Sequence, residues 1–541
     1  MSDAVHAHVL IVGAGGAGLS LALLLQQQGV SSILVERRAD VSWFPRARNL
    51  NFRTLEIFRA LGLDKQVRAA STHVSRVVRK QSLAAPGHED FPAVENTFRL
   101  TDHPEALSPE PMFVYCPQSV TEPLLVAAAR ERGCDIRYGR ELVSFTQDSA
   151  GVTATVTDCV SGTPTQLRTD YLVAADGAHS RVREQLGIKV AGEGMLDEYY
   201  IFVYFRADWA ELVRGYESDA VLIDRPGIRG FFLITDPDRG MFLIQQDHAQ
   251  EYTPQHCREL IVDGLGVPDL PVEVVDVAAW RPAQQVAEQF RDRRVLLAGD
   301  AAHTMPPKLG LGVNTAIASM QNLAWKLAAV IHGQADDTLL DTYHDERHPV
   351  GELVSRQSLV GPAATLLTRG EDDTLLPAEQ RIPLFSLIIG YRYRSRAVLS
   401  GDRASRTKDG IELLHGPEEL TATPGTRLPH ADLARDDESV SPLDLFDGRF
   451  VVLAGTAGAQ WSTAAVAAAA VTGVPLAVYR IGPDTDLRDP GGKWWTAMGL
   501  PADGAVLMRP DGIVAWRADS VSVDPAAAMT QALTTILGRR S

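Results

Sequence analysis

The sequence predicts a mixed fold in which α/β and α+β parts follow one another along the chain. It begins with an apolar strand, a glycine-rich turn and a helix, the pattern of a parallel sheet covered by helices. The middle of the chain, residues 186–275, contains runs such as EYYIFVYFRADW, whose alternation and aromatic content favour an antiparallel sheet. After a polar, Pro-rich stretch (TATPGTRLPHADLARDDESVSP), short apolar runs and a final helix predict a small C-terminal α/β unit.

Composition and charge place this 541-residue chain among ordinary globular proteins, with 45% hydrophobic and 22% charged residues. No apolar run reaches the roughly 18 residues of a membrane-spanning helix, and the N-terminus does not resemble a signal peptide. We therefore expect a cytoplasmic protein without a membrane partner. The net charge of −16 argues against nucleic acid as a partner. Its four cysteines lack CxxC spacing and predict neither a disulfide framework nor a metal site.

The N-terminal stretch VLIVGAGGAGLSLALLLQQQGVSSILVE carries a phosphate-binding pattern. Gly13, Gly15 and Gly18 form G-x-G-x-x-G directly after an apolar strand. The first glycine makes the tight turn, the second lets backbone amides approach a pyrophosphate, and the third lets helix and strand pack closely. Glu36, at the end of the next strand, is where a carboxylate can bind ribose hydroxyls. The pattern predicts dinucleotide binding, with NAD and FAD both open and a simple glycine-rich turn as the alternative.

Two later strands also end in polar residues. In YLVAADGAHSRVREQLG an apolar strand runs into Asp176-Gly177, for which a plain turn with Ser180 as a helix N-cap is the alternative. In LLAGDAAHTMPPKLGLG a strand ends at Gly299-Asp300, and open α/β sheets place ligand contacts at the carboxyl ends of their strands.

A third stretch, PRARNLNFRTLEIFRALGL, places Arg46 ahead of an amphipathic helix that ends near Gly62. The predicted helix carries Arg53 and Arg59, which we expect on a solvated face.

These motifs, in this order, resemble those of the FAD-dependent group A aromatic monooxygenases, which have the para-hydroxybenzoate hydroxylase fold. Shorter words of that family are present as well: PRA at 45–47, CPQ at 116–118, NLAWKLA at 322–328 and DTYHDERHPV at 341–350. The resemblance covers nearly the whole chain and indicates FAD rather than NAD as the bound dinucleotide. The long chain looks closest to actinobacterial hydroxylases of aromatic polyketides.

The resemblance implies four consecutive regions: a first part of a Rossmann-type FAD-binding domain (1–185, with a substrate-domain insertion near 70–115), an antiparallel substrate-binding sheet (186–275), a completion of the FAD-binding domain with further helices (276–405), and a linker with a thioredoxin-like domain (406–541). That last domain contains no cysteine, which excludes dithiol redox chemistry there. Within it, Pro510-Asp511-Gly512 predicts a hairpin turn rather than a site.

The same resemblance implies a set of FAD-binding residues. Gly13, Gly15, Gly18, Glu36 and Arg37 would hold the pyrophosphate and adenosine. Arg46, Gln118 and Leu142 would flank the cofactor, and Asp300 would bind the ribityl chain. Asp176 and Arg183 belong to the motif associated with both FAD and the nicotinamide donor. The backbone around Gly310, Gly312, Val313 and Asn314 would face the flavin pyrimidine edge, where helix-terminal amides stabilise the negative charge of reduced flavin.

The substrate and catalytic residues are less defined. Tyr200, Tyr204, Phe232, Phe242 and Gln246 are candidates to line a substrate pocket under the sheet, although each alone is as well explained as core or strand surface. No catalytic side chain is identified, because the flavin carries the chemistry.

The loop after Gly299-Asp300 departs from the family pattern. Lys308 and Leu309 stand after Pro306 and Pro307 where the family has two adjacent glycines. One hypothesis is that Lys308 lies near the flavin and carries a charge role toward substrate or nicotinamide. The alternative is that it points into solvent.

The implied function is that of an NAD(P)H-dependent monooxygenase of secondary metabolism, such as antibiotic biosynthesis. FAD is reduced by NADPH or NADH and reacts with O2, and a flavin C4a-hydroperoxide hydroxylates a phenolic or polyketide-type substrate. Baeyer–Villiger oxygen insertion on the same scaffold is one alternative, and a non-catalytic flavin-binding redox sensor is another. A homodimer is a family expectation.

Overall fold

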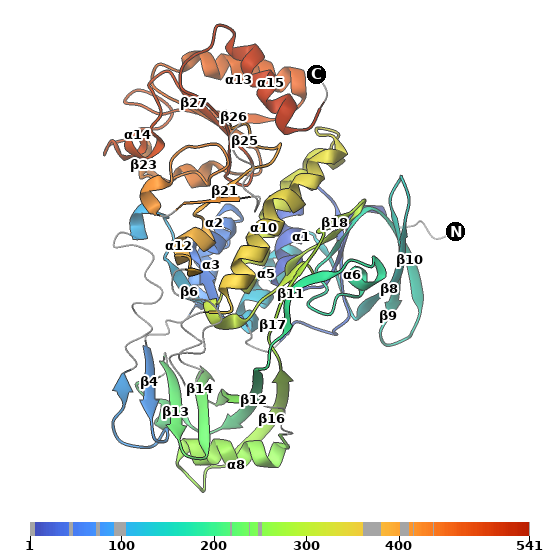
Figure 1. Ribbon diagram of the computed structural model, residues 1–541, viewed down its shortest axis with the longest axis vertical. Helices are drawn as coiled ribbons and strands as arrows, with labels where there is room; N and C mark the ends of the chain where they lie inside the picture. The colour runs from blue at the N-terminus through green and yellow to red at the C-terminus, as the bar shows by residue number, and fades with distance from the viewer. Residues whose placement is uncertain are drawn as a thin grey trace.

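The computed structural model describes residues 6–42, 47–71, 76–90, 104–216, 219–236, 238–246, 252–360, 380–400, 411–414, 416–436 and 438–539. Its mixed α/β architecture confirms the predicted fold class. Two large sheets and a smaller C-terminal sheet are arranged along the long axis of the molecule (Figure 1). None of the helices in the described ranges is long and apolar enough to cross a membrane.

The central sheet contains the N-terminal strand and runs in the order β18 (Arg291–Asp292), β19 (Val295–Leu297), β10 (Pro164–Ala174), β1 (His6–Val12), β2 (Ser32–Glu36) and β7 (Asp135–Tyr138). From β19 to β7 the neighbours are parallel, so their carboxyl ends meet at one edge. β8 (Arg140–Gln147) and β9 (Val152–Asp158) extend β10 as an antiparallel ribbon.

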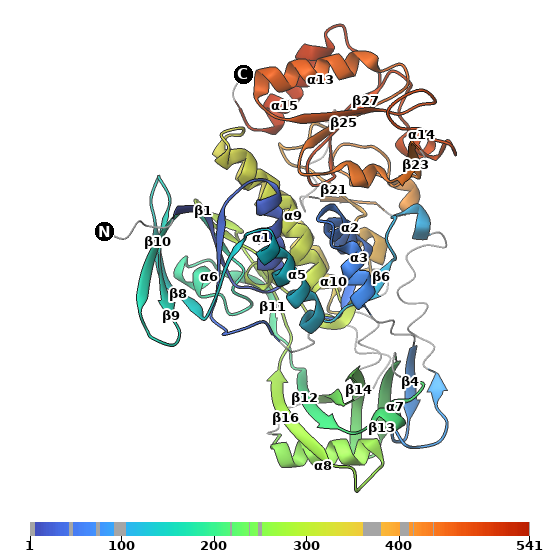
Figure 2. The ribbon, with the colours of Figure 1, turned by 180° about the vertical axis from the view of Figure 1, so that it is seen from behind.

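Helices cover the central sheet because its strands are apolar along their whole length. Val9, Leu10 and Ile11 are fully buried, as parallel strands with covered faces require. α1 (Gly16–Gln27) contacts both α5 (Gln118–Glu131) and α9 (Gly312–Ile331), which lie beside it in Figure 2. α6 (Arg181–Gln185) follows β10, and α10 (Asp341–Gln357) packs beside α9.

The second large sheet lies at the end of the molecule opposite the C-terminal unit (Figure 1). Its order is β16 (Val272–Trp280), β12 (Tyr199–Ala207), β15 (Arg239–Gln246), β14 (Ile228–Asp236), β13 (Asp219–Arg225), β4 (Arg76–Lys80) and β5 (Glu89–Asp90). All neighbours are antiparallel except β13 and β4. α8 (Pro254–Leu265) packs across one face, and α7 (Ala210–Val213) contributes to the same core.

Shorter elements join these parts. A small sheet of β11 (Val190–Met195), β17 (Ala283–Ala287) and β20 (His303–Thr304) lies between the two large sheets. The 3-10 turns η2 (Gly299–Ala301) and η3 (Pro307–Leu309) lead into α9. The remaining elements around α9 are β3 (Asn49–Asn51), α2 (Phe52–Ala60), α3 (Asp64–Ala70), β6 (Phe113–Tyr115), α12 (Leu384–Ile388), β21 (Tyr391–Tyr393) and β22 (Ile411–Leu413).

The C-terminal unit is built on the strands β26 (Leu476–Arg480), β25 (Phe450–Ala454), β27 (Ala505–Met508) and β28 (Val514–Ala518). β25 and β26 are parallel, and the other pairs are antiparallel. α13 (Ala459–Thr472) and α15 (Pro525–Ile536) cover one face, and α14 (Lys493–Met498) covers the other. The core of this unit continues into α9, because the Trp325 ring meets the Phe450 ring at 5.6 Å.

The polar, Pro-rich stretch ahead of this unit is packed rather than extended in solvent. Leu428 is fully buried, and its amide donates to the Gly512 carbonyl at 3.0 Å. Arg427 is 2% exposed and pairs with Glu56 of α2. From composition alone this stretch resembles a linker. Composition does not show the partners that bury it, because they lie in other parts of the chain.

The expectation of a solvated helix face is wrong for Arg53 and only partly right for Arg59, whose side chain is 32% exposed. The Arg53 side chain is 12% exposed and donates to Gln321 at 2.7 Å and to the Asp511 carbonyl at 2.8 Å. Arg59 donates to Glu110 at 3.0 Å and pairs with Asp444 of the C-terminal unit. The amphipathic pattern of α2 identifies a polar face, but it does not show that a later part of the chain covers that face.

Candidate functional site

The turn between β1 and α1 excludes side chains at two of its three predicted glycines. Gly13 has a φ of 106°, and a Cβ there would lie 2.2 Å from the Ala175 carbonyl oxygen. A Cβ on Gly18 would lie 1.9 Å from the Gly13 carbonyl oxygen. At Gly15, the N-cap of α1, the nearest atom to a Cβ would be Glu122 Oε1 at 3.7 Å. The turn therefore leaves helix-terminal amides accessible to an anion such as a pyrophosphate.

Glu36 is fixed at the end of β2 as a buried carboxylate. One of its oxygens accepts from the Ala14 amide at 2.9 Å, and the other accepts from the backbone and side chain of Arg38, both at 3.0 Å. Burial alone would raise the pKa of Glu36, but these hydrogen bonds outweigh it and hold the pKa below its ordinary value. The neighbouring Arg37, a predicted cofactor residue, is exposed. The carboxylate is paired with Arg38, which sequence reasoning missed.

A second carboxyl group, also missed from the sequence, lies opposite the glycine turn. Gln118, a predicted residue at the start of α5, donates to Glu122 Oε1 at 2.6 Å. Glu122 is 1% exposed, and burial raises its pKa. Its Oε2 and the Tyr138 hydroxyl are both buried and have no hydrogen-bond partner within the described part of the chain. The i, i+4 spacing of Gln118 and Glu122 could have revealed this pair. Buried polar atoms that lack a protein partner usually form hydrogen bonds with a ligand or with water.

The ends of β10 and β19 bring the other two motifs to the same edge as the glycine turn. The Ala175 amide donates to the Val12 carbonyl at 2.8 Å, and the Ala298 amide donates to the Ala174 carbonyl at 2.8 Å. Asp176 and Asp300 therefore follow neighbouring strand ends. Asp176 Oδ2 accepts from an α6 amide at 3.3 Å, while its buried Oδ1 lacks a partner among the described residues. Asp300 lies in η2 and is exposed at this edge.

Arg183 ties these two strand ends together. It donates to the Ala301 carbonyl beside Asp300 and to the Ala178 carbonyl beside Asp176, both at 2.9 Å. Ser180 caps α6 by accepting from the Arg183 amide at 3.0 Å. The capping interpretation of this stretch is therefore confirmed, and it coexists with the arrangement of Asp176 at the site edge.

The N-terminus of α9 lies beside the start of α1. A Cβ on Gly16 would lie 3.1 Å from a methyl group of Val313. The Thr315 amide makes the first backbone bond of α9, to the Leu311 carbonyl at 2.8 Å. The amides of residues 312–314 consequently precede the helical hydrogen-bond ladder, as the first amides of any helix do. They lie next to the glycine turn, an arrangement into which one extended dinucleotide could fit.

The Asn314 side chain holds the loop before α9 in place. Its oxygen accepts from the Asn51 amide at 2.9 Å and from the Thr54 hydroxyl at 2.6 Å. Its amide group donates to the Asn49 and Gly310 carbonyls, both at 2.9 Å. Gly310 has a φ of 64°, a conformation that favours glycine. The side chain is saturated by the protein, so only backbone atoms here are available to a ligand.

Two further predicted cofactor residues differ in what the structure says of them. Arg46 lies outside the described residues. Leu142 lies on β8, is 8% exposed and belongs to the hydrophobic core of the central sheet.

Phe232 and Phe242 are wrong as pocket-lining candidates. Both are fully buried, with ring centroids 4.5 Å apart, in the core between the sheet and α8. Alternation along a strand separates two faces, but it does not tell which face a helix covers. Gln246 pairs with Tyr199 at the end of β15, and its side chain lies outside what the structure describes.

The opposite face of this sheet is directed toward the central sheet. Tyr204 packs there with Met241, whose sulfur accepts from Arg48 of the central part at 3.5 Å. Tyr200 and Phe202 lie on the same face, because alternate residues of a strand share a face. The missed residue Trp280 pairs with Tyr200 across β12 and β16, and its ring lies 5.5 Å from that of Tyr200 and 6.3 Å from that of Phe202. Trp280 is 37% exposed, so this aromatic group is accessible at its edge.

Lys308 does not point into solvent. It is 2% exposed, and its Nζ donates to Glu198 Oε1 at 2.6 Å. Glu198 directly precedes β12, so a cation of the loop after Asp300 meets the start of the aromatic sheet. The alternative of a solvent-directed lysine is therefore wrong.

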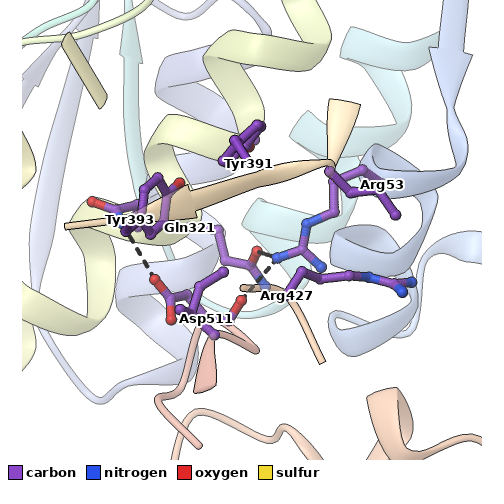
Figure 3. Close-up of a pocket in the computed structure, with 10 residues that line it drawn as sticks. Arg53, Gln321, Tyr391, Tyr393, Arg427 and Asp511 are labelled. Carbon is purple, nitrogen blue, oxygen red and sulfur yellow. Dashed lines mark hydrogen bonds between the residues drawn. The ribbon is translucent and has the colours of Figure 1, made fainter. Parts of the chain in front are cut away.

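The C-terminal unit inserts a charged turn beside α9. The predicted hairpin turn is confirmed, with the Gly512 amide donating to the Arg509 carbonyl at 3.0 Å. Figure 3 shows Arg53 directed toward Gln321 and the turn that carries Asp511, whereas the Arg427 side chain extends away from that turn. The cavity they line with Tyr391, Tyr393 and Gln321 has a volume of about 10 Å³. That is room for roughly one water molecule, so the cavity is too small for an organic ligand.

Glu346 of α10 is the centre of this charged group. It accepts from Arg509 at 2.6 and 2.9 Å and from Lys326 at 2.8 Å. Burial opposes its ionisation, but the two cations hold the pKa of Glu346 well below its ordinary value. Burial lowers the pKa of Lys326 to about 8. The cluster joins α9, α10 and the C-terminal unit.

Two family models together match most of the chain. A model described as an FAD binding domain matches residues 6–358. A model described as the C-terminal part of aromatic-ring hydroxylases matches residues 421–540.

Named relatives and solved structures extend over the full length. The chain is 38% identical to 4-methyl-5-nitrocatechol 5-monooxygenase of a Burkholderia species, over 99% of this chain and 98% of that protein. It is 38% identical to aklavinone 12-hydroxylase of Streptomyces purpurascens, over 98% and 99%. Its structure is similar to aklavinone-11 hydroxylase in complex with FAD and aklavinone, with a TM-score of 0.88 at 37% identity and 100% coverage of both chains.

Proposed function

The chain belongs to the family of FAD-dependent aromatic-ring hydroxylases, and we propose that it hydroxylates a phenolic or polyketide-type aromatic compound with NADPH or NADH and O2. The observation that carries the proposal is the convergence of the glycine turn, Glu36, Asp300 and the start of α9 at one edge of the central sheet, with an aromatic sheet face directed toward that sheet. Relatives named for nitrocatechol and aklavinone support an aromatic substrate.

The described residues fit FAD. The turn at Gly13, Gly15 and Gly18 would hold its pyrophosphate, and Glu36 would bind the adenosine ribose. Glu122 Oε2 and Asp176 Oδ1 are buried atoms without partners along the described part of this edge, and the hydroxyls and amides of a nucleotide would satisfy them. Asp300 would accept hydrogen bonds from the ribityl chain.

When bound, FAD supplies the transfer of electrons from the nicotinamide donor to O2 and of one oxygen atom to the substrate. The chain contributes position, charge and exclusion of water. The amides of residues 312–314, at the positive end of α9, would stabilise negative charge on the flavin pyrimidine edge. The pair of Phe202 and Trp280 would hold a flat aromatic ring by stacking.

The division of the chain is also part of the proposal. Segments 1–185 and 276–405 would form one FAD-binding domain, which is supported by the pairing of β19 with β10. The C-terminal unit would be thioredoxin-like, which is supported by its mixed sheet with helices on both faces. Without cysteine, it would act as a structural brace for α9.

The test is a substrate screen with the purified, flavin-loaded protein. FAD released by heating is identified by its spectrum, and NADPH or NADH oxidation is followed with simple phenols and fused-ring aromatic ketones. The expected result is a compound that accelerates oxidation and gains one oxygen from 18O2 as a ring hydroxyl, assigned by NMR. A ring-expanded ester would indicate Baeyer–Villiger insertion instead. Slow oxidation that yields only peroxide with every compound would favour a redox sensor.

A further inference from the structure

The loop between η2 and α9 contains a buried lysine at a position where flexibility is expected. Pro306 and Pro307 stiffen the first part of the loop, and Lys308 and Leu309 occupy the places of two glycines in the family pattern. Lys308 is only 2% exposed. A lysine is seldom buried to this extent unless its charge is paired.

The contacts of Lys308 join the loop to two other elements. Its Nζ donates to Glu198 Oε1 at 2.6 Å and to the Leu359 carbonyl at 3.4 Å. Leu359 lies just beyond the end of α10, where the helix dipole favours a cation. Nζ already donates to these two acceptors inside the protein. They therefore explain a charged side chain at this position better than a direct contact with a substrate or nicotinamide does.

Glu198 also contacts the aromatic face of the sheet. Its second oxygen accepts from the Tyr200 hydroxyl at 2.8 Å, and the Tyr200 ring lies 5.5 Å from that of Trp280. A continuous chain of contacts therefore runs from Lys308 through Glu198 and Tyr200 to Trp280. Charge-assisted hydrogen bonds of this kind are stronger than neutral ones and constrain geometry.

The other side of the same loop is fixed to the site edge. The Asn314 side chain donates to the Gly310 carbonyl at 2.9 Å, and Gly310 donates its amide to the Pro307 carbonyl at 2.9 Å. The loop thus lies between the N-terminus of α9 and the start of β12, and it is held from both directions.

We propose that Lys308 and Glu198 are positioning residues whose ion pair locks the loop Pro306–Gly310 onto the start of β12. The lock fixes the spacing between the helix-terminal amides of α9 and the aromatic face with Tyr200 and Trp280. Its effect on turnover rests on the proposed function: with the spacing lost, reducing equivalents leave as peroxide instead of oxygenating the substrate. Its effect on the loop does not depend on any substrate.

Amide hydrogen exchange of the flavin-loaded protein tests the lock directly. Lys308→Gln and Glu198→Gln each remove one charge and keep a side chain of similar length. Because a buried pair is broken in both variants, we expect the Gly310 amide to exchange about tenfold faster in each. The double variant should exchange no faster than either single one, since both substitutions break the same contact. Lys493→Gln, at an exposed ion pair with Asp432, is the matched control and should exchange as the parent protein does.

A second readout separates the lock from a general loss of structure. FAD content and the visible flavin spectrum should be unchanged in the single variants, while peroxide formed per NADPH or NADH consumed should rise about tenfold with any substrate that is turned over. Parent-like exchange at Gly310 in Lys308→Gln, or additive effects in the double variant, would overturn the lock even if the enzyme is active. If no aromatic compound is hydroxylated, the proposed function fails while the exchange result still decides the lock.

Discussion

His303 should make the folded protein acid-sensitive, because its surroundings disfavour the protonated form of this histidine. It lies in β20, is 1% exposed, and neither ring nitrogen has a hydrogen-bond partner among the described residues. Its ring packs against Phe290, with centroids 6.0 Å apart, and a Cβ on Gly351 would lie 3.3 Å from it. Burial, together with the nearby guanidinium of Arg347, lowers the pKa of His303 from 6.5 to about 3.

The sign and size of the effect follow from these two pKa values. Between pH 6.5 and about 3 the unfolded chain binds a proton that the folded protein does not bind, so falling pH favours unfolding. Stability from this group is complete above pH 6.5 and is lost progressively below it. Each pH unit below 6.5 lowers the free energy of unfolding by about 1.36 kcal/mol, so the loss at pH 5 is about 2 kcal/mol.

Urea unfolding of the flavin-loaded protein at pH 7.5 and pH 5 measures this difference. His303→Leu removes the titrating group at similar volume, so the loss of unfolding free energy between the two pH values should be about 2 kcal/mol smaller than in the parent. His256→Leu makes the same change on the surface of α8, where the side chain is 42% exposed, and should leave the parent pH dependence unchanged. An unaltered pH dependence in His303→Leu would refute the reasoning.

Three further substitutions test other parts of the structure. Gly18→Ala places a Cβ 1.9 Å from the Gly13 carbonyl oxygen, so FAD affinity measured by flavin fluorescence should fall at least about a hundredfold; a yellow, parent-like protein would contradict this. Arg509→Met leaves Glu346 and Asp511 without their shared cation, and urea unfolding should show a loss of about 3–5 kcal/mol; a loss below about 1 kcal/mol would contradict a buried pair. Trp280→Ala removes the exposed ring of the aromatic face and should weaken substrate binding about tenfold at unchanged FAD content; an unchanged KM would exclude stacking there.

Local pattern was sufficient for the parts of the fold that are formed by neighbouring residues. The turn at Gly13 and Gly18 is determined by contacts within a strand–helix–strand unit, so glycine spacing and an apolar strand predict it. Ser180 as the cap of α6 and the hairpin turn at residues 510–512 are equally local. The decisive contacts of Gly18, Ser180 and the hairpin turn span only a few residues, whereas Gly13 also closely approaches Ala175 of the distant β10 end.

The failures have two causes, which are a partner distant in the sequence and a strand face that alternation leaves undecided. Arg53 lies 458 residues from Asp511, and nothing in the helix pattern of α2 indicates that a C-terminal turn covers it. Phe232 is buried under α8 because of the face it occupies, and alternation leaves the choice of face open. Lys308 stands out in the sequence as a departure from a glycine loop, but Glu198, 110 residues earlier, is what makes its burial favourable.

These distant contacts converge on α9, which gives the C-terminal unit a physical route to the proposed cofactor site. The helix begins with amides directed at that site, carries Lys326 in the charged cluster, and packs Trp325 against Phe450. Lys326 of α9 pairs with Glu346 of α10, which pairs in turn with Arg509 of the C-terminal unit. A helix is stiff over its 20 residues, so this network holds the whole element, its first turn included. The Lys308–Glu198 pair fixes the loop that precedes this turn. We therefore expect the spacing between the amides of α9 and the aromatic face to depend on ion pairs outside the glycine motifs. One is the network of Lys326, Glu346 and Arg509, which reaches the C-terminal unit, and the other is the Lys308–Glu198 pair, which reaches the sheet.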